Sequence, residues 1–336
     1  MQTRRGWQPQ QKLQKTLVYI LFVPCFSFLS VLLLNLTTRG DQISYSRLYG
    51  AYKNAPIHKI LEVGRQVVGS SEPLSLFLIW IGAVLSIDKH IYISIWNFVL
   101  ISGICHLGNL HKLRPFTIFL LLTNFYLFVL ITTTERLKFA YIIGIWAIIY
   151  RGKLGLTLAA ISPLAHFQSL LFLPGLVASQ RLLQTFRALS RGIIKSKDFI
   201  AGCTITSAAA FTFYYFSDTL LHKATSYYNQ MPPNSDLVNL AILTSIATIV
   251  TRRKINMLMM LLPMFVLAVF LGANRINMIA FSLVFYALLQ EQKCEHPLIL
   301  LLLTYFSAKS IPFILNIILF GDGFYNHSYL FLNFFQ

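Results

Sequence analysis

The sequence predicts an all-α integral membrane protein, with about ten or eleven transmembrane helices in one polytopic domain. Apolar runs near the length of a bilayer-spanning helix, about 20 residues, recur from one end of the chain to the other. Only 12% of the 336 residues are charged and the mean hydropathy is +0.64, whereas soluble domains carry roughly 25% charged residues. No polar stretch is long enough for a separate soluble domain, so the predicted domain covers residues 1–336.

The first apolar run follows a basic N-terminus. We expect residues 1–15 to form a cytoplasmic tail. Residues 17–36 are too long for a signal-peptide core and no small-residue cleavage site follows, so an uncleaved first span is expected. The polar residues 37–73 then form a large periplasmic loop. Within this loop, a Tyr and Leu spacing typical of one helix face indicates a short amphipathic helix at the membrane interface. The residues concerned are Tyr45, Leu48, Tyr49 and Tyr52.

Ten further apolar segments follow the loop. They are residues 74–87, 91–107, 116–132, 137–150, 154–178, 199–221, 237–251, 255–272, 276–289 and 298–320. The formal net charge of +17 is attributed mainly to Lys and Arg in short cytoplasmic loops. Residues 180–197 and 251–254 are the basic loops expected there. Some of the excess charge is expected to meet anionic lipid or a phosphate-bearing substrate, and nucleic acid is not an expected partner.

The middle of the chain leaves two topologies open. In the first, residues 74–87 cross the membrane and every later segment alternates. In the second, these residues are too short to cross, about 14 against a need of about 20, and lie in the outer interface. Residues 154–178 must then enter and leave from the same side, with Pro163 and Pro174 breaking the helix near His166.

Ionisable residues at the ends of apolar segments are the first candidates for function, because charge near membrane depth is unfavourable. Arg39 and Asp41 come directly after the first span, and Arg39 alone is equally well explained as a snorkelling anchor. Glu72 precedes Pro73 and is explained by helix capping unless it faces Asp41 or a bound sugar hydroxyl. Arg136 begins a predicted helix, where a cation is disfavoured, so a phosphate or carboxylate partner is expected.

Four further candidate residues lie in the second half of the chain or close to it. His166 stands in an apolar segment, as a hydrogen-bonded helix residue or as a donor or general base in a cavity. Asn274 and Arg275 occupy a turn between two apolar segments. Lys309 is the most deeply embedded cation and must snorkel, pair or line water. The four cysteines stand singly, and neither a zinc spacing nor a nucleotide-binding motif is present, so no metal and no cofactor is expected.

Five short motifs, in this order, resemble a bacterial family, the repeat-unit polymerases of O-antigen and exopolysaccharide synthesis (Wzy type, EpsG-like branch). The motifs are Thr38–Asp41 followed by Tyr45 and Tyr49, Ser71–Leu74, Glu135–Ala140, Leu164–Leu171 and Asn274–Ile276. The resemblance covers about Val18 to Leu289. Leu137 stands where the family often has Gln, and Phe-Gln follows His166 where a basic or small residue is more frequent.

The resemblance implies a GT-C-like helical glycosyltransferase of the bacterial cytoplasmic (inner) membrane, acting on its outer face. Such an enzyme moves a growing glycan from undecaprenyl pyrophosphate onto a new lipid-linked repeat unit, with a chain-length regulator protein as a further partner. Asp41 or Glu72 would be the general base and His166 would orient a substrate. Arg136 and Arg275 would bind pyrophosphate, with Arg39 and Asn274 beside them as substrate-binding residues.

Two other classes of protein are weighed against this interpretation. A transporter or flippase for lipid-linked sugars also has about ten spans, but typically shows inverted repeats and charges at mid-membrane depth. A non-enzymatic membrane scaffold would not need an arginine at a helix N-terminus. The position of the charges at segment ends favours chemistry at the membrane interface.

Overall fold

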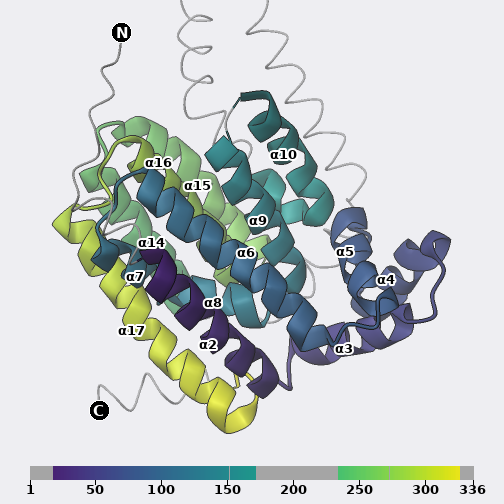
Figure 1. The fold of residues 1–336 in the computed structure, drawn as a ribbon. Coiled ribbons are helices and arrows are strands. Elements are labelled where there is room, and N and C mark those ends of the chain that lie inside the picture. Colours follow the sequence, from purple (N-terminus) through teal and green to yellow (C-terminus); the bar gives the residue numbers. More distant parts are fainter. Residues whose placement is uncertain (1–17, 151, 172–233, 272, 326–336) are drawn as a thin grey trace, which may run out of the picture. The chain divides into compact units, whose positions relative to one another are not determined.

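The computed structural model describes residues 18–150, 152–171, 234–271 and 273–325, which fold into helices joined by short turns and loops (Figure 1). No strand occurs among these residues, so the all-α class is confirmed for this part of the chain. The chain divides into two compact units, residues 1–169 with 303–336 and residues 170–302. The predicted tail 1–15, basic loop 180–197 and span 199–221 lie outside the described residues.

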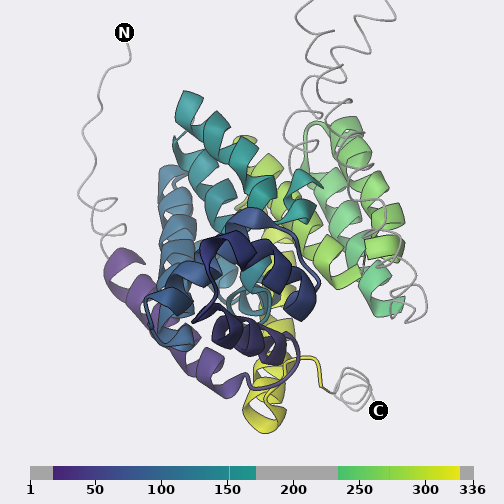
Figure 2. The same ribbon diagram turned by 90° about the vertical axis from the view of Figure 1, so that its right-hand side faces the viewer.

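The first unit contains most of the described helices. In chain order they are a π-helical turn Val18–Phe22, α2 Val23–Leu36, α3 Asp41–Tyr52, a 3-10 turn Ile57–Lys59, α4 Ile60–Val68, α5 Pro73–Val84, α6 Lys89–Leu110, α7 Pro115–Leu122, α8 Phe125–Thr132, α9 Glu135–Tyr150, α10 Gly152–Ala165, a 3-10 helix Phe167–Leu171 and most of α17 Pro297–Phe320. Helix α6 packs against α2 and α9, and α9 packs against α10. Helices α3, α4 and α5 gather near the N-terminal end of α6 (Figures 1 and 2).

In the described part of the second unit, three consecutive helices pack against one another. They are α14 Asn234–Val250, α15 Lys254–Leu271 and α16 Ala273–Gln290.

Several described helices are suited to crossing a membrane. Three are long and apolar enough, at residues 18–36, 89–110 and 297–320, and two bent helix pairs raise the number to five if each pair is one span. Helix α10 and parts of α14, α15 and α16 are apolar but shorter. These helices fit a helical membrane protein, and the total of ten or eleven spans stays a prediction.

Two segments predicted as continuous are interrupted or shortened in the structure. Residues 116–132 form α7 and α8, which meet at a 50° bend. The bend is at Asn124, whose Oδ1 accepts a hydrogen bond of 2.9 Å from the Tyr126 amide and so caps α8. Helix α5 has 12 residues and lies at 100° to α4. At 1.5 Å per residue it is about 18 Å long, shorter than the hydrocarbon core of a bilayer. The second topology requires residues 74–87 to be too short to cross the membrane, and the length of α5 agrees with that requirement.

Helix α3 is the amphipathic helix predicted in the large loop, and its apolar stripe packs on protein. Tyr45, Leu48, Tyr49 and Tyr52 are buried, in one core cluster with residues of α5, α6 and α9. The hydroxyls of Tyr49 and Tyr52 donate to backbone carbonyl oxygens over 2.8 Å. These contacts hold α3 against the other helices of the first unit.

The embedded cation Lys309 finds an aromatic partner in the first unit. Its Nζ lies 4.6 Å from the centroid of the Phe125 ring. A cation over an aromatic face is stabilised by the ring quadrupole, and more strongly so where water is excluded. Of the three expected outcomes for Lys309, which were snorkelling, pairing and lining water, the structure shows pairing, here with an aromatic ring.

The packing of α3, α5 and α6 predicts opposite effects for two glycine substitutions. A Cβ at Gly82 would lie 2.6 Å from the Tyr92 ring and 2.7 Å from the Tyr49 hydroxyl oxygen, whereas one at Gly50 meets nothing within 4 Å. Gly82→Ala should destabilise the protein by about 1–3 kcal/mol through overpacking, and Gly50→Ala should stabilise it by about 0.5–1 kcal/mol through helix propensity. Thermal unfolding of the purified variants measures both, and equal shifts would contradict the described packing.

Candidate functional site

Glu72 is the centre of a buried polar cluster in the first unit. Its Oε2 accepts hydrogen bonds from Arg136 Nη1 at 2.7 Å and from Ser70 Oγ at 2.9 Å. Its Oε1 contacts His166 Nδ1 and accepts from the Phe167 amide at 3.2 Å. We call Tyr45, Ser70, Glu72, Arg136, His166 and Gln168 the Glu72 cluster. The side chain makes no capping hydrogen bond to α5, so capping does not account for this residue.

Arg136 reaches the cluster from the first turn of α9. Its Nη1 binds Glu72, and its Nε donates to the Tyr45 hydroxyl at 3.3 Å. The anionic partner expected for an arginine at a helix N-terminus is therefore a carboxylate of the chain itself. Nη2 makes no hydrogen bond to the described residues, and the side chain is 11% exposed. One edge of the guanidinium is consequently available to an oxygen of a ligand.

His166 lies at the end of α10, between that helix and the following 3-10 turn. Its Nδ1 contacts Glu72, and its Nε2 is 3.2 Å from Gln168 Oε1. Each ring nitrogen of His166 therefore has a side-chain oxygen as its neighbour, from Glu72 on one side and from Gln168 on the other. The cluster thus places the carboxylate of Glu72 in direct contact with the guanidinium of Arg136 and the imidazole ring of His166.

Tyr45 connects the cluster to the exposed surface of α3. Burial raises the pKa of its phenol above the ordinary value, and the charge of Asp41 acts in the same direction, while that of Arg136 opposes it. The phenol therefore stays protonated at neutral pH. Asp41 is exposed in the first turn of α3, one turn before Tyr45. A carboxylate open to solvent thus stands beside the buried cluster.

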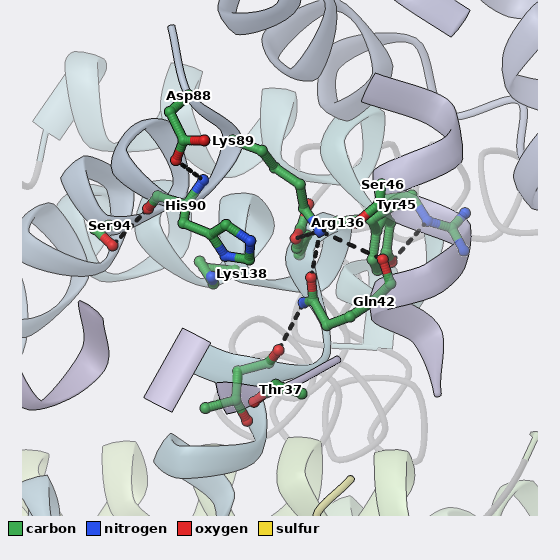
Figure 3. Close-up of polar contacts among 12 residues, drawn as sticks. Thr37, Gln42, Tyr45, Ser46, Asp88, Lys89, His90, Ser94, Arg136 and Lys138 are labelled. Carbon is green, nitrogen blue, oxygen red and sulfur yellow. Dashed lines mark hydrogen bonds and ion pairs between the residues drawn. The ribbon is translucent and has the colours of Figure 1, made fainter. Parts of the chain in front are cut away.

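A second polar network, the Lys89 network, adjoins the Glu72 cluster (Figure 3). It consists of Gln42, Ser46, Lys89 and Glu135. Lys89 Nζ donates to Gln42 Oε1 at 2.5 Å and to Ser46 Oγ at 2.9 Å, and it lies 3.6 Å from Glu135 Oε1. Close by, Lys138 is fully buried and donates to the Ile131 carbonyl oxygen at 3.1 Å.

The remaining candidates are placed elsewhere. The guanidinium of Arg39 stacks over the Tyr325 ring, 5.5 Å from its centroid, and its amide donates to the Gly321 carbonyl oxygen. Asn274 and Arg275 belong to the second unit, in the first turn of α16 and not in a turn before it. The side chain of Asn274 lies outside the described part. The structure thus brings Glu72, Arg136 and His166 together, beside Asp41.

Five residues of the two networks were not singled out from the sequence, and neither was the nearby Lys138. The five are Gln42, Ser46, Ser70, Lys89 and Gln168. Ser70 lies two residues before Glu72, and Gln168 lies two residues after His166. This closeness in the sequence to a charged candidate was the signal that could have identified them. Lys89 and Lys138 appeared as ordinary basic residues. Lys138 follows Glu135 by three positions and so shares its helix face. This spacing was the signal in the sequence that could have drawn attention to Lys138.

The fold and the cluster define a helical membrane protein with a buried acid–base site at helix ends. Among the described residues, no group of three or more His, Cys, Asp or Glu side chains is placed to hold a metal ion. Comparisons with protein-family models, with curated proteins and with solved structures found no match.

Proposed function

We propose that the chain is a GT-C-like polysaccharide polymerase, which joins undecaprenyl-pyrophosphate-linked repeat units on the outer face of the bacterial cytoplasmic membrane. The observation that carries the proposal is the Glu72 cluster. Its charged members come from the start of α5, the start of α9 and the end of α10. Charges at helix ends suit a reaction at the membrane interface, where a lipid pyrophosphate and a sugar hydroxyl meet.

In the proposed reaction, a hydroxyl of the incoming repeat unit attacks the anomeric carbon of the growing glycan. The new glycosidic bond forms as the bond to the pyrophosphate oxygen breaks, and undecaprenyl pyrophosphate leaves. The hydroxyl proton passes to a general base. We assign this base to Asp41, which is exposed in the first turn of α3 and so open to an acceptor hydroxyl, whereas Glu72 is buried.

Arg136 and His166 are assigned to the leaving group. The free edge of Arg136 donates to a pyrophosphate oxygen. In the proposed reaction His166 is protonated, so that it adds positive charge where negative charge develops. Glu72 is a positioning residue, because it holds both cations in place through hydrogen bonds. In this proposal Glu72 has a different role from the catalytic one expected from the sequence.

One observation favours the alternative, a transporter or flippase for lipid-linked sugars. Buried acid–base pairs are typical of such proteins, and Lys89 and Glu135 form one. Both residues are the first of their helices, α6 and α9. The pair therefore lies at helix ends, like the Glu72 cluster, and the polymerase remains the better supported function.

Deletion of the gene in its bacterial host separates the two functions. Loss of a polymerase should leave surface polysaccharide with a single repeat unit, whereas loss of a flippase should leave none. Complementation with Asp41→Ala should give the one-unit product at a normal protein level. Arg136→Lys should do the same, because it keeps a cation beside the buried Glu72. The matched control is Arg47→Ala, an exposed residue of α3 outside the cluster. Long chains in both site variants would overturn the assignment of these residues.

A further inference from the structure

We propose that Lys89 is a positioning residue. It fastens α3 to the N-terminal end of α9 and so maintains the hydrogen bond between Arg136 and the Tyr45 hydroxyl. The fastening is inferred from the contacts of the Lys89 network alone. Its effect on activity rests on the proposed polymerase function.

Lys89 contacts α3 at three points, although it begins α6. Nζ donates to the side-chain and backbone oxygens of Gln42, at 2.5 and 3.3 Å, and to Ser46 Oγ at 2.9 Å. Gln42 and Ser46 are four residues apart and therefore neighbours on one helix face. The ammonium also lies 3.6 Å from Glu135 Oε1 in α9, and the lysine side chain is 8% exposed. One buried cation thus joins α3, α6 and α9.

Gln42 closes the network on its other side. Its Nε2 donates to the Thr132 carbonyl oxygen at 2.6 Å, just before α9 begins, while its Oε1 accepts from Lys89. A carbonyl needs a donor and an ammonium needs an acceptor, so this amide has one orientation. Because Gln42 is buried, its loss would leave the Thr132 carbonyl and part of the ammonium without partners.

The contacts of this network lie next to those of the proposed site. Tyr45 follows Gln42 by three residues and shares its face of α3, and Arg136 follows Glu135 directly. The bond of 3.3 Å from Arg136 to Tyr45 therefore joins the same two helices as the bridge through Lys89 (Figure 3). The guanidinium of Arg136 has two hydrogen-bond partners, Glu72 and Tyr45. A shift of the first turns of α3 therefore removes one of the two groups that orient it.

Hydrogen exchange of the full-length protein in lipid nanodiscs tests the fastening directly. In Lys89→Met, peptides covering residues 41–52 should exchange about tenfold faster or more, because hydrogen bonds to a charged group are lost. Gln42→Leu should do the same while it leaves the Lys89–Glu135 pair intact. Lys53→Met and Gln66→Leu are matched controls on exposed residues, and peptides of α17 should be unchanged throughout. Unchanged exchange in residues 41–52 of Gln42→Leu would overturn the proposal.

The double variant Lys89→Met with Glu135→Gln separates positioning from charge balance, because it leaves no unpaired carboxylate. If fast exchange of α3 persists in it, the contacts with Gln42 and Ser46 are the cause, as proposed. A return to the exchange of the unaltered protein would show that Lys89 only neutralises Glu135. This variant also serves where Lys89→Met alone fails to fold.

Polysaccharide length in complemented cells tests the consequence for the site. Lys89→Met and Gln42→Leu should shift the product toward one repeat unit, and the two controls should give long chains. Fast exchange of α3 with unaltered chain length would overturn the positioning role. If deletion of the whole gene leaves chain length unaltered, the polymerase function fails, and hydrogen exchange still decides whether Lys89 fastens α3.

Discussion

Glu72→Ala is expected to destabilise the protein by about 3–5 kcal/mol and to abolish polymer formation, because it leaves the buried guanidinium of Arg136 without its carboxylate and removes the partner of His166. Arg136 and His166 are 11% and 6% exposed, so water cannot replace the lost partner. The thermal midpoint of the purified protein in detergent measures the first effect, and the length of the surface polysaccharide measures the second.

The double variant Glu72→Leu with Arg136→Met is the control for this prediction. Removal of both partners of a buried ion pair is often near neutral for stability, since no charge is left unpaired. His166 remains, so the recovery should be large but incomplete. The double variant should still make no polymer. A double variant less stable than Glu72→Ala would contradict the role of the ion pair.

Arg136→Lys is expected to retain most of the stability and to lower polymerisation by about a hundredfold or more, because a point charge cannot replace a planar fork. Lysine can keep the ion pair with Glu72. It cannot also donate to Tyr45, as Nε of the arginine does, and present a second edge to pyrophosphate, the role proposed for Nη2. The rate of glycan elongation, with the protein level measured in parallel, tests this expectation.

Arg65→Lys is the matched control, since Arg65 lies exposed on α4, outside both networks. It should leave elongation unchanged. An Arg136→Lys variant that elongates glycan at the rate of the unaltered protein would show that only the charge at this position matters.

The sequence alone predicted the helical class and three members of the Glu72 cluster, for one physical reason. Charge is costly near membrane depth, so Glu72, Arg136 and His166 stood out in an apolar chain. Their mutual contact was not predictable, because residues 72, 136 and 166 are joined only by the tertiary packing of α5, α9 and α10.

The Lys89 network was missed because burial on one face of a helix depends on its neighbours. Gln42 is polar, yet it is 2% exposed because it packs between α6 and the end of α8. The break between α7 and α8 was missed for a related reason. Neither Pro nor Gly marks it, and the cap made by Asn124 was the only local signal.

Coupling of repeat units by the purified full-length chain tests the central claim most directly. Undecaprenyl-pyrophosphate-linked single units, extracted from the deletion strain, are incubated with the protein in nanodiscs, and the products are identified by mass spectrometry. The account predicts lipid-linked glycans of two or more units with release of undecaprenyl pyrophosphate, and none of these from Glu72→Ala. Unchanged single units after incubation with the unaltered protein, or equal yields from Glu72→Ala, would contradict it.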